Sequence, residues 1–188
     1  MHNFSLRKTH ALNGYVETVN GINICELTDI EIFALAIPIG KERTAKTSFK
    51  KYFNCGMPDV GKLEAIHKNQ MHILRMSNDQ LFAINKSSSK SEFRKIFIGL
   101  GAKFYITEQT DSWVGLKVGG NRINECLERI CMIDISIEKF GVNNFARTMM
   151  EHMGVIILRT KDHEFEIFSA SSSIKSFLHA ITTSAKNI

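Results

Sequence analysis

Long apolar runs, paired cysteines and glycine-rich phosphate loops are all missing from this 188-residue sequence. No stretch reaches the ~18 consecutive apolar residues that a membrane-spanning helix needs. Arg7 and Lys8 are not followed by the apolar core of a secretory signal. We therefore expect no membrane association and a cytoplasmic location. Proline is also scarce, since only Pro38 and Pro58 interrupt the chain.

The four cysteines form no Cys-x-x-Cys pair, so free thiols in a reducing compartment are expected. They are Cys25, Cys55, Cys126 and Cys131. Cys126 and Cys131 are five residues apart, a spacing that turns two side chains away from one another on a helix. The spacing of His67 and His72 is the same and falls on a loop–strand junction. Neither pair has the spacing of a zinc ribbon or finger, so we expect no metal site.

Signatures of catalysis and of nucleotide binding are absent too. There is no Gly-x-Ser-x-Gly elbow. A dinucleotide loop needs glycines after a strand and before a helix. Gly99 and Gly101 stand instead at a helix end, and no third glycine follows Gly119 and Gly120 before Arg122. We therefore expect no catalytic residue and no cofactor bound by this chain.

The formal charge of +5 invites a nucleic-acid reading. The densest basic stretch, 41–51, also carries Ala45 and Phe49, with Tyr52 and Phe53 just after it, at helical spacing. This pattern is typical of an amphipathic helix whose charges face solvent. We expect no nucleic-acid partner.

Apolar residues make up 44% and charged residues 23%, which indicates a folded globular chain: one domain, or two small ones sharing a core. Hydrophobic periodicity and turn residues predict the elements. The first half reads as an irregular segment 1–20, strand signal over 22–37 broken near 28–29, a helix over 42–54, a connection 55–69, a hairpin of 72–75 and 80–85, a helix around 93–100 capped by Ser87 to Ser89, and a strand over 102–107.

The pattern restarts in the second half. It reads as a strand over 113–118, a helix carrying Ile123, Leu127, Ile130 and Cys131, a strand over 147–150, a hairpin of 155–159 and 164–169, and a final helix over 174–181 capped by Ser171 to Ser173.

A shift of 84 residues superimposes the two hairpins. It places Ile73-Leu74-Arg75 on Ile157-Leu158-Arg159, and the serine caps and Phe93 on their counterparts. The sequence therefore predicts an α+β fold with two pseudo-repeated halves, 21–108 and 109–188, after the N-terminal segment 1–20. In each half an antiparallel sheet carries helices on one face, and the other face would be open to a partner.

A series of short elements carries a family resemblance. In order they are Thr110-Asp111-Ser112-Trp113-Val114, Leu116, Val118-Gly119, Arg129-Ile130-Cys131, Asp134, Phe140, Ala146-Arg147-Thr148 and the strands 155–159 and 164–168. In their order and spacing they resemble the gamma subunit of heterotetrameric sarcosine oxidase. Departures occur in the last helix, where Phe177 and His179 replace the family's tryptophans, and just before it, where Ala170 or Ser171 stands at a usual arginine.

The resemblance implies a fold like the folate-binding aminomethyltransferase (T-protein) of glycine cleavage. It implies a non-catalytic subunit whose partners are the alpha, beta and delta subunits, and these would hold FAD, FMN, NAD and tetrahydrofolate. The complex oxidatively demethylates sarcosine to glycine. Two alternatives stay open: a free-standing folate-binding protein, or a subunit of a related N-methyl amino acid oxidase or dehydrogenase.

Four residues are candidates for a structural role or a subunit contact: Asp111, Trp113, Arg147 and Thr148. We expect Trp113, the only tryptophan, to be largely buried or at a subunit contact. Arg147 would hold a partner carboxylate or form an internal salt bridge to Asp111 or Asp134. In the folate-binding alternative, Asp111 or Asp134 would engage the pterin from a central pocket.

Overall fold

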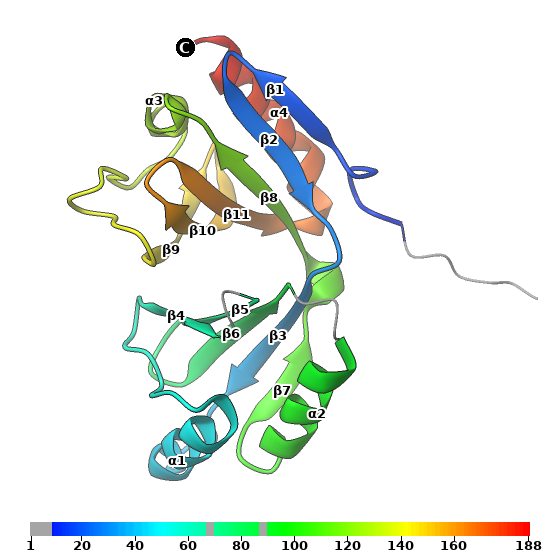
Figure 1. Ribbon diagram of the computed structural model, residues 1–188, viewed down its shortest axis with the longest axis vertical. Helices are drawn as coiled ribbons and strands as arrows, with labels where there is room; N and C mark the ends of the chain where they lie inside the picture. Colours follow the sequence, from blue (N-terminus) through cyan, green and yellow to red (C-terminus); the bar gives the residue numbers. More distant parts are fainter. Residues whose placement is uncertain (1–8, 67–69, 87–89) are drawn as a thin grey trace, which may run out of the picture.

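The computed structural model describes residues 9–66, 70–86 and 90–188. Its strands form two antiparallel sheets that lie one above the other in Figure 1. The five-stranded sheet has the order β4-β5-β6-β3-β7 and the six-stranded sheet the order β1-β2-β8-β11-β10-β9. The expected serine cap at 87–89 and His67 lie outside the described residues.

The five-stranded sheet is built from the middle of the sequence. Its strands are β3 (Glu31–Ala36), β4 (Leu63–Ile66), β5 (Met71–Arg75), β6 (Gln80–Asn85) and β7 (Tyr105–Glu108). Helices α1 (Glu42–Phe53) and α2 (Lys90–Leu100) pack on one face of it. Phe49 and Phe53 of α1 and Phe97 of α2 are buried against Phe33 and Leu35 of β3, which gives these helices their amphipathic period.

The six-stranded sheet joins both ends of the described chain. Its strands are β1 (Val16–Val19), β2 (Ile22–Leu27), β8 (Trp113–Gly119), β9 (Phe145–Met150), β10 (Met153–Lys161) and β11 (Glu164–Ala170). Its helices are α3 (Ile123–Glu128) and α4 (Ile174–Lys186), and the short 3-10 turns are η1 (Thr110–Ser112) and η2 (Ser171–Ser173). Both helices cover one face of this sheet.

The remaining faces of the two sheets pack against each other. This layer contains Ile32, Leu74 and Phe82 from one sheet and Leu158 and Phe168 from the other. Each sheet thus covers the apolar face that we had expected to be open to a partner. The reason is the gain from removing both apolar faces from water within one chain.

Several local expectations are confirmed. The strand signal over 22–37 divides into β2 and β3, and Asp29, with φ of 56°, turns the chain between them. Helix α1 and both hairpins lie where the periodicity placed them. A tight turn follows Gly119, the last residue of β8: the Ile123 amide donates to the Gly120 carbonyl at 3.0 Å. A Cβ at Gly120 would lie 2.3 Å from the Gly21 carbonyl oxygen.

Other expectations are corrected. Residues 16–19 of the supposedly irregular N-terminus form β1, and the connection 55–69 contains β4. Helix α3 ends at Glu128, so Ile130 and Cys131 lie beyond it, and Cys131 forms a strand bridge to Met150. The serines at 171–173 make the turn η2 and no side-chain cap, because the Ser173 hydroxyl donates backward to the Ala170 carbonyl.

The N-terminal boundary of the first half also moves. Strand β2 pairs with β8, so residues 22–27 belong to the sheet of the second half. There β2 lies beside β8, as β7 lies beside β3 in the other sheet. The chain crosses from one sheet to the other only after β2. Strand order along the sequence could not show this, because sequential strands usually pair with one another.

Candidate functional site

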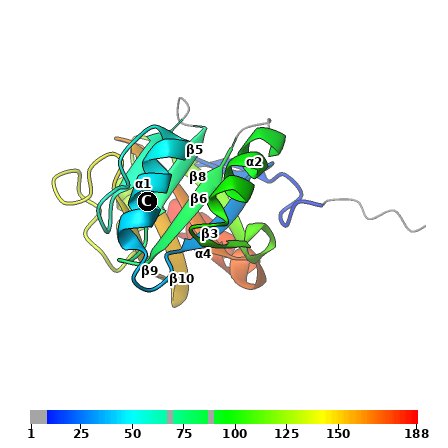
Figure 2. The same ribbon diagram turned by 90° about the horizontal axis from the view of Figure 1, so that it is seen from below.

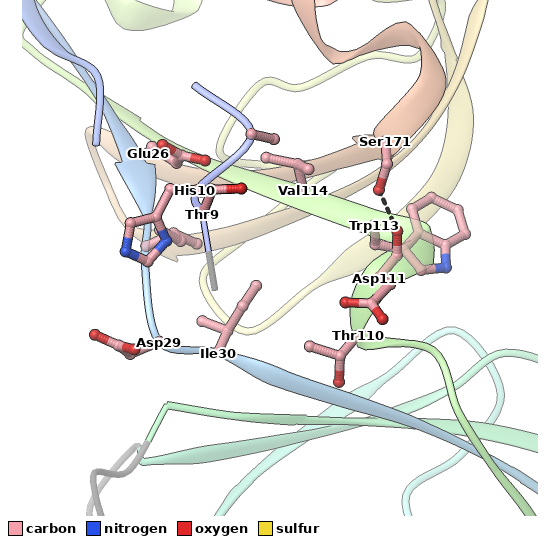
Figure 3. Close-up of a pocket in the computed structure, with 12 residues that line it drawn as sticks. Thr9, His10, Glu26, Asp29, Ile30, Thr110, Asp111, Trp113, Val114 and Ser171 are labelled. Carbon is pink, nitrogen blue, oxygen red and sulfur yellow. Dashed lines mark hydrogen bonds between the residues drawn. The ribbon is translucent and has the colours of Figure 1, made fainter. Parts of the chain in front are cut away.

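A pocket of about 200 Å³ opens where the chain crosses between the two sheets (Figure 3). Four regions supply its walls: the N-terminal segment, the link between β2 and β3, the turn η1 with the start of β8, and the turn η2. Its lining is Thr9, His10, Ala11, Glu26, Leu27, Asp29, Ile30, Thr110, Asp111, Trp113, Val114 and Ser171. It therefore brings together two of the four candidate residues, Asp111 and Trp113.

The Glu26 carboxylate fixes one wall of this pocket. It is buried at the end of β2 and accepts the backbone amides of Leu12 at 3.1 Å and Gly14 at 2.7 Å. Hydrogen bonds to a carboxylate are stronger than those to a neutral acceptor. The N-terminal segment is thereby held against β2, and its residues 9–11 close one side of the pocket.

Asp111 occupies the opposite wall on η1. Its turn is tied down on two sides: the Ser171 hydroxyl donates to the Asp111 carbonyl at 2.6 Å, and the Thr110 hydroxyl accepts the Ile32 amide at 3.1 Å. The Asp111 side chain itself is exposed. Within the described ranges it forms no ion pair, so a fixed backbone presents a carboxylate at the pocket (Figure 3).

Asp134, the other acidic candidate, lies outside this pocket. Its carboxylate accepts the Ser136 amide at 2.8 Å in the loop after α3. The hydrogen bonds from the Ser136 side chain and backbone hold the pKa of Asp134 below its usual value. Asp134 is thus a turn-stabilising residue.

Trp113 is half-buried, and its expected subunit contact stays a prediction. Its ring stands edge-on to Phe82, with centroids 6.1 Å apart, at the margin of the layer between the sheets. One side of the ring therefore packs on the apolar layer while the residue also lines the pocket. Position 113 begins β8, directly after the turn η1 that links the two sheets.

Arg147 and Thr148 lie on β9, an edge strand of the six-stranded sheet. Arg147 is exposed and Thr148 half-buried. Among the described residues Arg147 forms no ion pair, so the expected internal salt bridge to Asp111 or Asp134 is not found. The pocket does not include either residue of β9.

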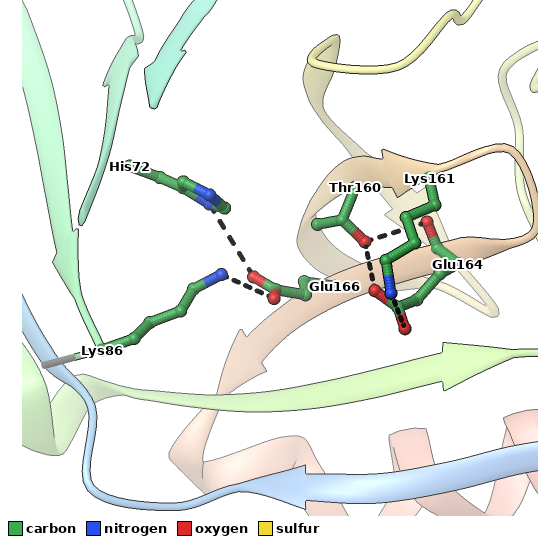
Figure 4. A network of polar contacts seen from close by, with 6 residues as sticks. All are labelled: His72, Lys86, Thr160, Lys161, Glu164 and Glu166. Atoms are coloured by element: carbon green, nitrogen blue, oxygen red, sulfur yellow. Dashed lines mark hydrogen bonds and ion pairs between the residues drawn. The ribbon is translucent and has the colours of Figure 1, made fainter. Parts of the chain in front are cut away.

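A buried polar cluster between the sheets was missed by sequence reasoning (Figure 4). Lys86, just after β6, pairs with Glu166 of β11 at 2.6 Å, and His72 of β5 places its Nδ1 3.9 Å from the same carboxylate. Burial, and then the charge of Lys86, lower the pKa of His72 to about 4. The histidine is therefore neutral at neutral pH, and the ionic link between the sheets is that of Lys86 and Glu166.

Among the residues that the structure describes, two atoms of this cluster have no hydrogen-bond partner: Nδ1 of His72 and Oε2 of Glu166. A buried polar atom left without a partner costs stability. A sequence signal for this cluster does exist. His72 and Glu166 are single polar residues at positions that face the other sheet, between apolar neighbours such as Met71 and Ile73.

No group of three or more His, Cys, Asp or Glu side chains in the described part of the chain could hold a metal ion. Burial raises the pKa of the Cys55, Cys126 and Cys131 thiols, which disfavours the reactive thiolate. Within the same described ranges, no helix is long and apolar enough to span a membrane.

The comparisons with known proteins show the fold. No family model matches the chain, and no curated protein matches it. Among solved structures, a chain of the heterotetrameric sarcosine oxidase from Corynebacterium sp. U-96 is similar, with a TM-score of 0.78 and 16% identity over 92% of this chain and 87% of that one. The aminomethyltransferase T of the glycine cleavage system from Bartonella henselae gives a TM-score of 0.61 and 10% identity.

The chain spans 46% of that aminomethyltransferase, with 87% of its own length aligned. These structural similarities show that the chain has an α+β fold of the kind that occurs in aminomethyltransferase T. More particularly, nearly the whole chain has the fold of a chain in heterotetrameric sarcosine oxidase.

Proposed function

We propose that this chain is a non-catalytic, gamma-type subunit of a heterotetrameric, flavin-dependent sarcosine oxidase and contributes to its assembly. One observation carries the proposal: the similarity to a chain of such an enzyme extends over nearly the full length of both chains, at a TM-score of 0.78. The resemblance of the segments around Asp111, Trp113 and Arg147 points to the same family. The partners would be the alpha, beta and delta subunits, which would hold FAD, FMN, NAD and tetrahydrofolate.

Co-expression with the large flavoprotein subunits of the same source organism tests this function. The chain should co-elute with them in gel filtration, while the purified chain alone should show no flavin spectrum after dialysis and no turnover of sarcosine. A chain that elutes alone beside a fully active enzyme would refute the subunit role. The substrate preference of the assembled complex would distinguish a sarcosine oxidase from a related N-methyl amino acid oxidase.

A second candidate is a free-standing folate-binding protein, which the position of Asp111 favours. This carboxylate stands at a pocket beside Trp113, as engagement of a pterin would require. The pocket, at about 200 Å³, is smaller than the roughly 300–1,000 Å³ usual for ligands of drug size. Titration with tetrahydrofolate would quench Trp113 fluorescence if this function holds, and Asp111→Asn would weaken the quenching. No quenching at millimolar folate would exclude it.

We also propose that the two halves are a structural repeat. Its support is a set of matching hydrogen bonds at the two hairpins. The Gly61 amide donates to the Arg75 carbonyl and the Asn143 amide to the Arg159 carbonyl, each at 2.9 Å. In both places the donor has a left-handed φ, 80° and 65°. In this scheme β2 supplies to the second half the strand that β7 supplies to the first.

A further inference from the structure

The positive charge of the chain is concentrated at one end of the molecule. Six exposed cations lie on α1, directly before it and in the turn before β7: Lys41, Arg43, Lys46, Lys50, Lys51 and Lys103. The only acidic residue among them is Glu42. Their net charge of +5 equals that of the whole chain, so the rest of the sequence is formally neutral. Figure 2 shows α1 and α2 side by side at this end.

These charges are not neutralised within the molecule. In the part of the chain that the structure describes, none of the six cations forms an ion pair. Lys46 and Lys50 are four residues apart on α1, and Arg43 and Lys46 three apart. Like charges at these spacings destabilise a helix. A surface selected for solubility alone would intersperse both signs.

Two hollows lie at this end of the molecule, one beside α1 and one beside α2. One, of about 350 Å³, is lined by Lys41, Thr44 and Lys103 together with Tyr105 at the start of β7. A second, of about 320 Å³, lies between α2 and the strands β3 and β7, and its lining is Phe33, Arg94, Phe97, Ile98, Ile106 and Glu108. Ile98 is 79% exposed and Tyr105 70%. The combination of exposed apolar anchors with a rim of charge is the anatomy of a protein interface.

We propose that the end formed by α1, α2 and β7 docks an acidic surface of a partner protein. Charge complementarity identifies the partner: its carboxylates would meet the cations of α1, and an apolar side chain would enter the groove at Ile98. Nucleic acid would match the cations but has no counterpart for the aliphatic groove. Strand β7 is also an edge strand of its sheet, which leaves its outer backbone groups accessible to the partner. In identifying the partner as a subunit of the oxidase, the inference rests on the proposed function.

A charge-removal experiment in the complex tests this surface. The double variant Lys46→Gln/Lys50→Gln removes two cations from α1. Its matched control is Lys175→Gln/Lys186→Gln, which removes two cations from α4 at the opposite end of the molecule. With the co-expressed flavoprotein subunits, the α1 variant should bind about fivefold or more weakly, and the control as the wild type does. Added salt screens the charges and should therefore reduce the difference in affinity between the wild type and the α1 variant.

The outcomes separate the two proposals. If the wild type co-elutes and the α1 variant binds equally well, the docking surface is wrong and the subunit function stands. If the wild type does not co-elute, the subunit function is wrong, and NMR titrations of the chain alone then decide on the surface. A 20-residue polyglutamate peptide should shift resonances of α1 and of residues 103–105. Shifts elsewhere, or equal binding of a 20-base-pair DNA duplex or of phosphatidylserine vesicles, would overturn the inference.

Discussion

The two hairpins, β5–β6 and β10–β11, share a plan and differ where they face one another. Each has a buried arginine at or near the end of its first strand, Arg75 or Arg159, that donates to a carbonyl of its own turn. In the layer between the sheets, however, His72 stands where the other hairpin has Ile156, and Glu166 where the other has Phe82. Both turns need the same arginine hydrogen bond to a backbone carbonyl, so that residue type recurs. The side chains between the sheets pack against each other, so the residues at matching positions of the two hairpins differ.

The largest difference between the hairpins should appear on removal of the arginines. Arg159 is 0% exposed, donates also to the buried Ile135 carbonyl, and lies 4.4 Å over the Phe165 ring. Arg159→Met should cost about 3–5 kcal/mol of unfolding free energy, because that carbonyl loses its donor. Arg75→Met should cost only about 1 kcal/mol, because water can reach the turn at Asn78.

Urea unfolding of the two variants measures this contrast. Equal losses would show that the turn contact alone matters and that the bond to Ile135 contributes nothing. Wild-type protein and Lys175→Gln, an exposed change on α4, give the baseline.

Glu166→Leu should have the next largest effect. It leaves Lys86 without its carboxylate at 2.6 Å, and Lys86 is only 19% exposed. We expect a loss of about 2–3 kcal/mol. Because the penalty belongs to the unpaired cation, Lys86→Met in the same chain should recover most of it. A double-mutant cycle measured by urea unfolding checks the coupling. Additive losses from the two single variants would mean that the ion pair does not link the sheets.

The pH dependence of stability should distinguish His72 from its apolar counterpart, Ile156. The folded-state pKa of His72 is about 4, below the ordinary value of 6.5, so the unfolded chain binds the proton more readily. This contribution is fully present above pH 6.5 and is lost as the pH falls toward 4. Between pH 7.5 and 5 the wild type should lose about 2 kcal/mol from this group. His72→Ile should lack that part of the decline in urea unfolding, and parallel pH curves would contradict the prediction.

Most secondary structure was predictable because it depends on local periodicity. The spacing of Phe49 and Phe53 gave α1, and the polar turns at 77–79 and 161–163 gave both hairpins. Strand β4 was not predicted because it is four residues long and follows Gly56, Pro58 and Gly61, which favour a loop. The assignment of β2 to the six-stranded sheet was not predicted either. It depends on a pairing with β8, whose residues lie about ninety positions further along the chain, and such a pairing leaves no local pattern in the sequence.

The candidate site was predictable only where backbone position decided it. Asp111 and Trp113 are two residues apart at a predicted strand start, so their proximity was expected, whereas the crossing between the sheets at which they lie was not. The cluster of His72, Lys86 and Glu166 required knowledge that the two sheets face each other. Without that, a lone histidine or glutamate within a strand has no identifiable partner.

The smallest effect on stability should come from substitution of Arg147 on the edge strand β9. The matching edge strand of the other sheet is β4. By strand pairing Arg147 corresponds to Ala65, since Arg147 lies opposite Ile156 and Ala65 opposite His72. The arginine is exposed and unpaired by any described carboxylate, so Arg147→Ala should change the unfolding free energy by less than about 0.5 kcal/mol. In the assembled complex, a larger loss of binding would identify β9 as a subunit contact. A stability loss above 1 kcal/mol in the isolated chain would instead mean that Arg147 supports the layer between the sheets. Arg147→Lys separates these outcomes further, because it keeps the charge and removes the planar fork that holds a carboxylate through two hydrogen bonds.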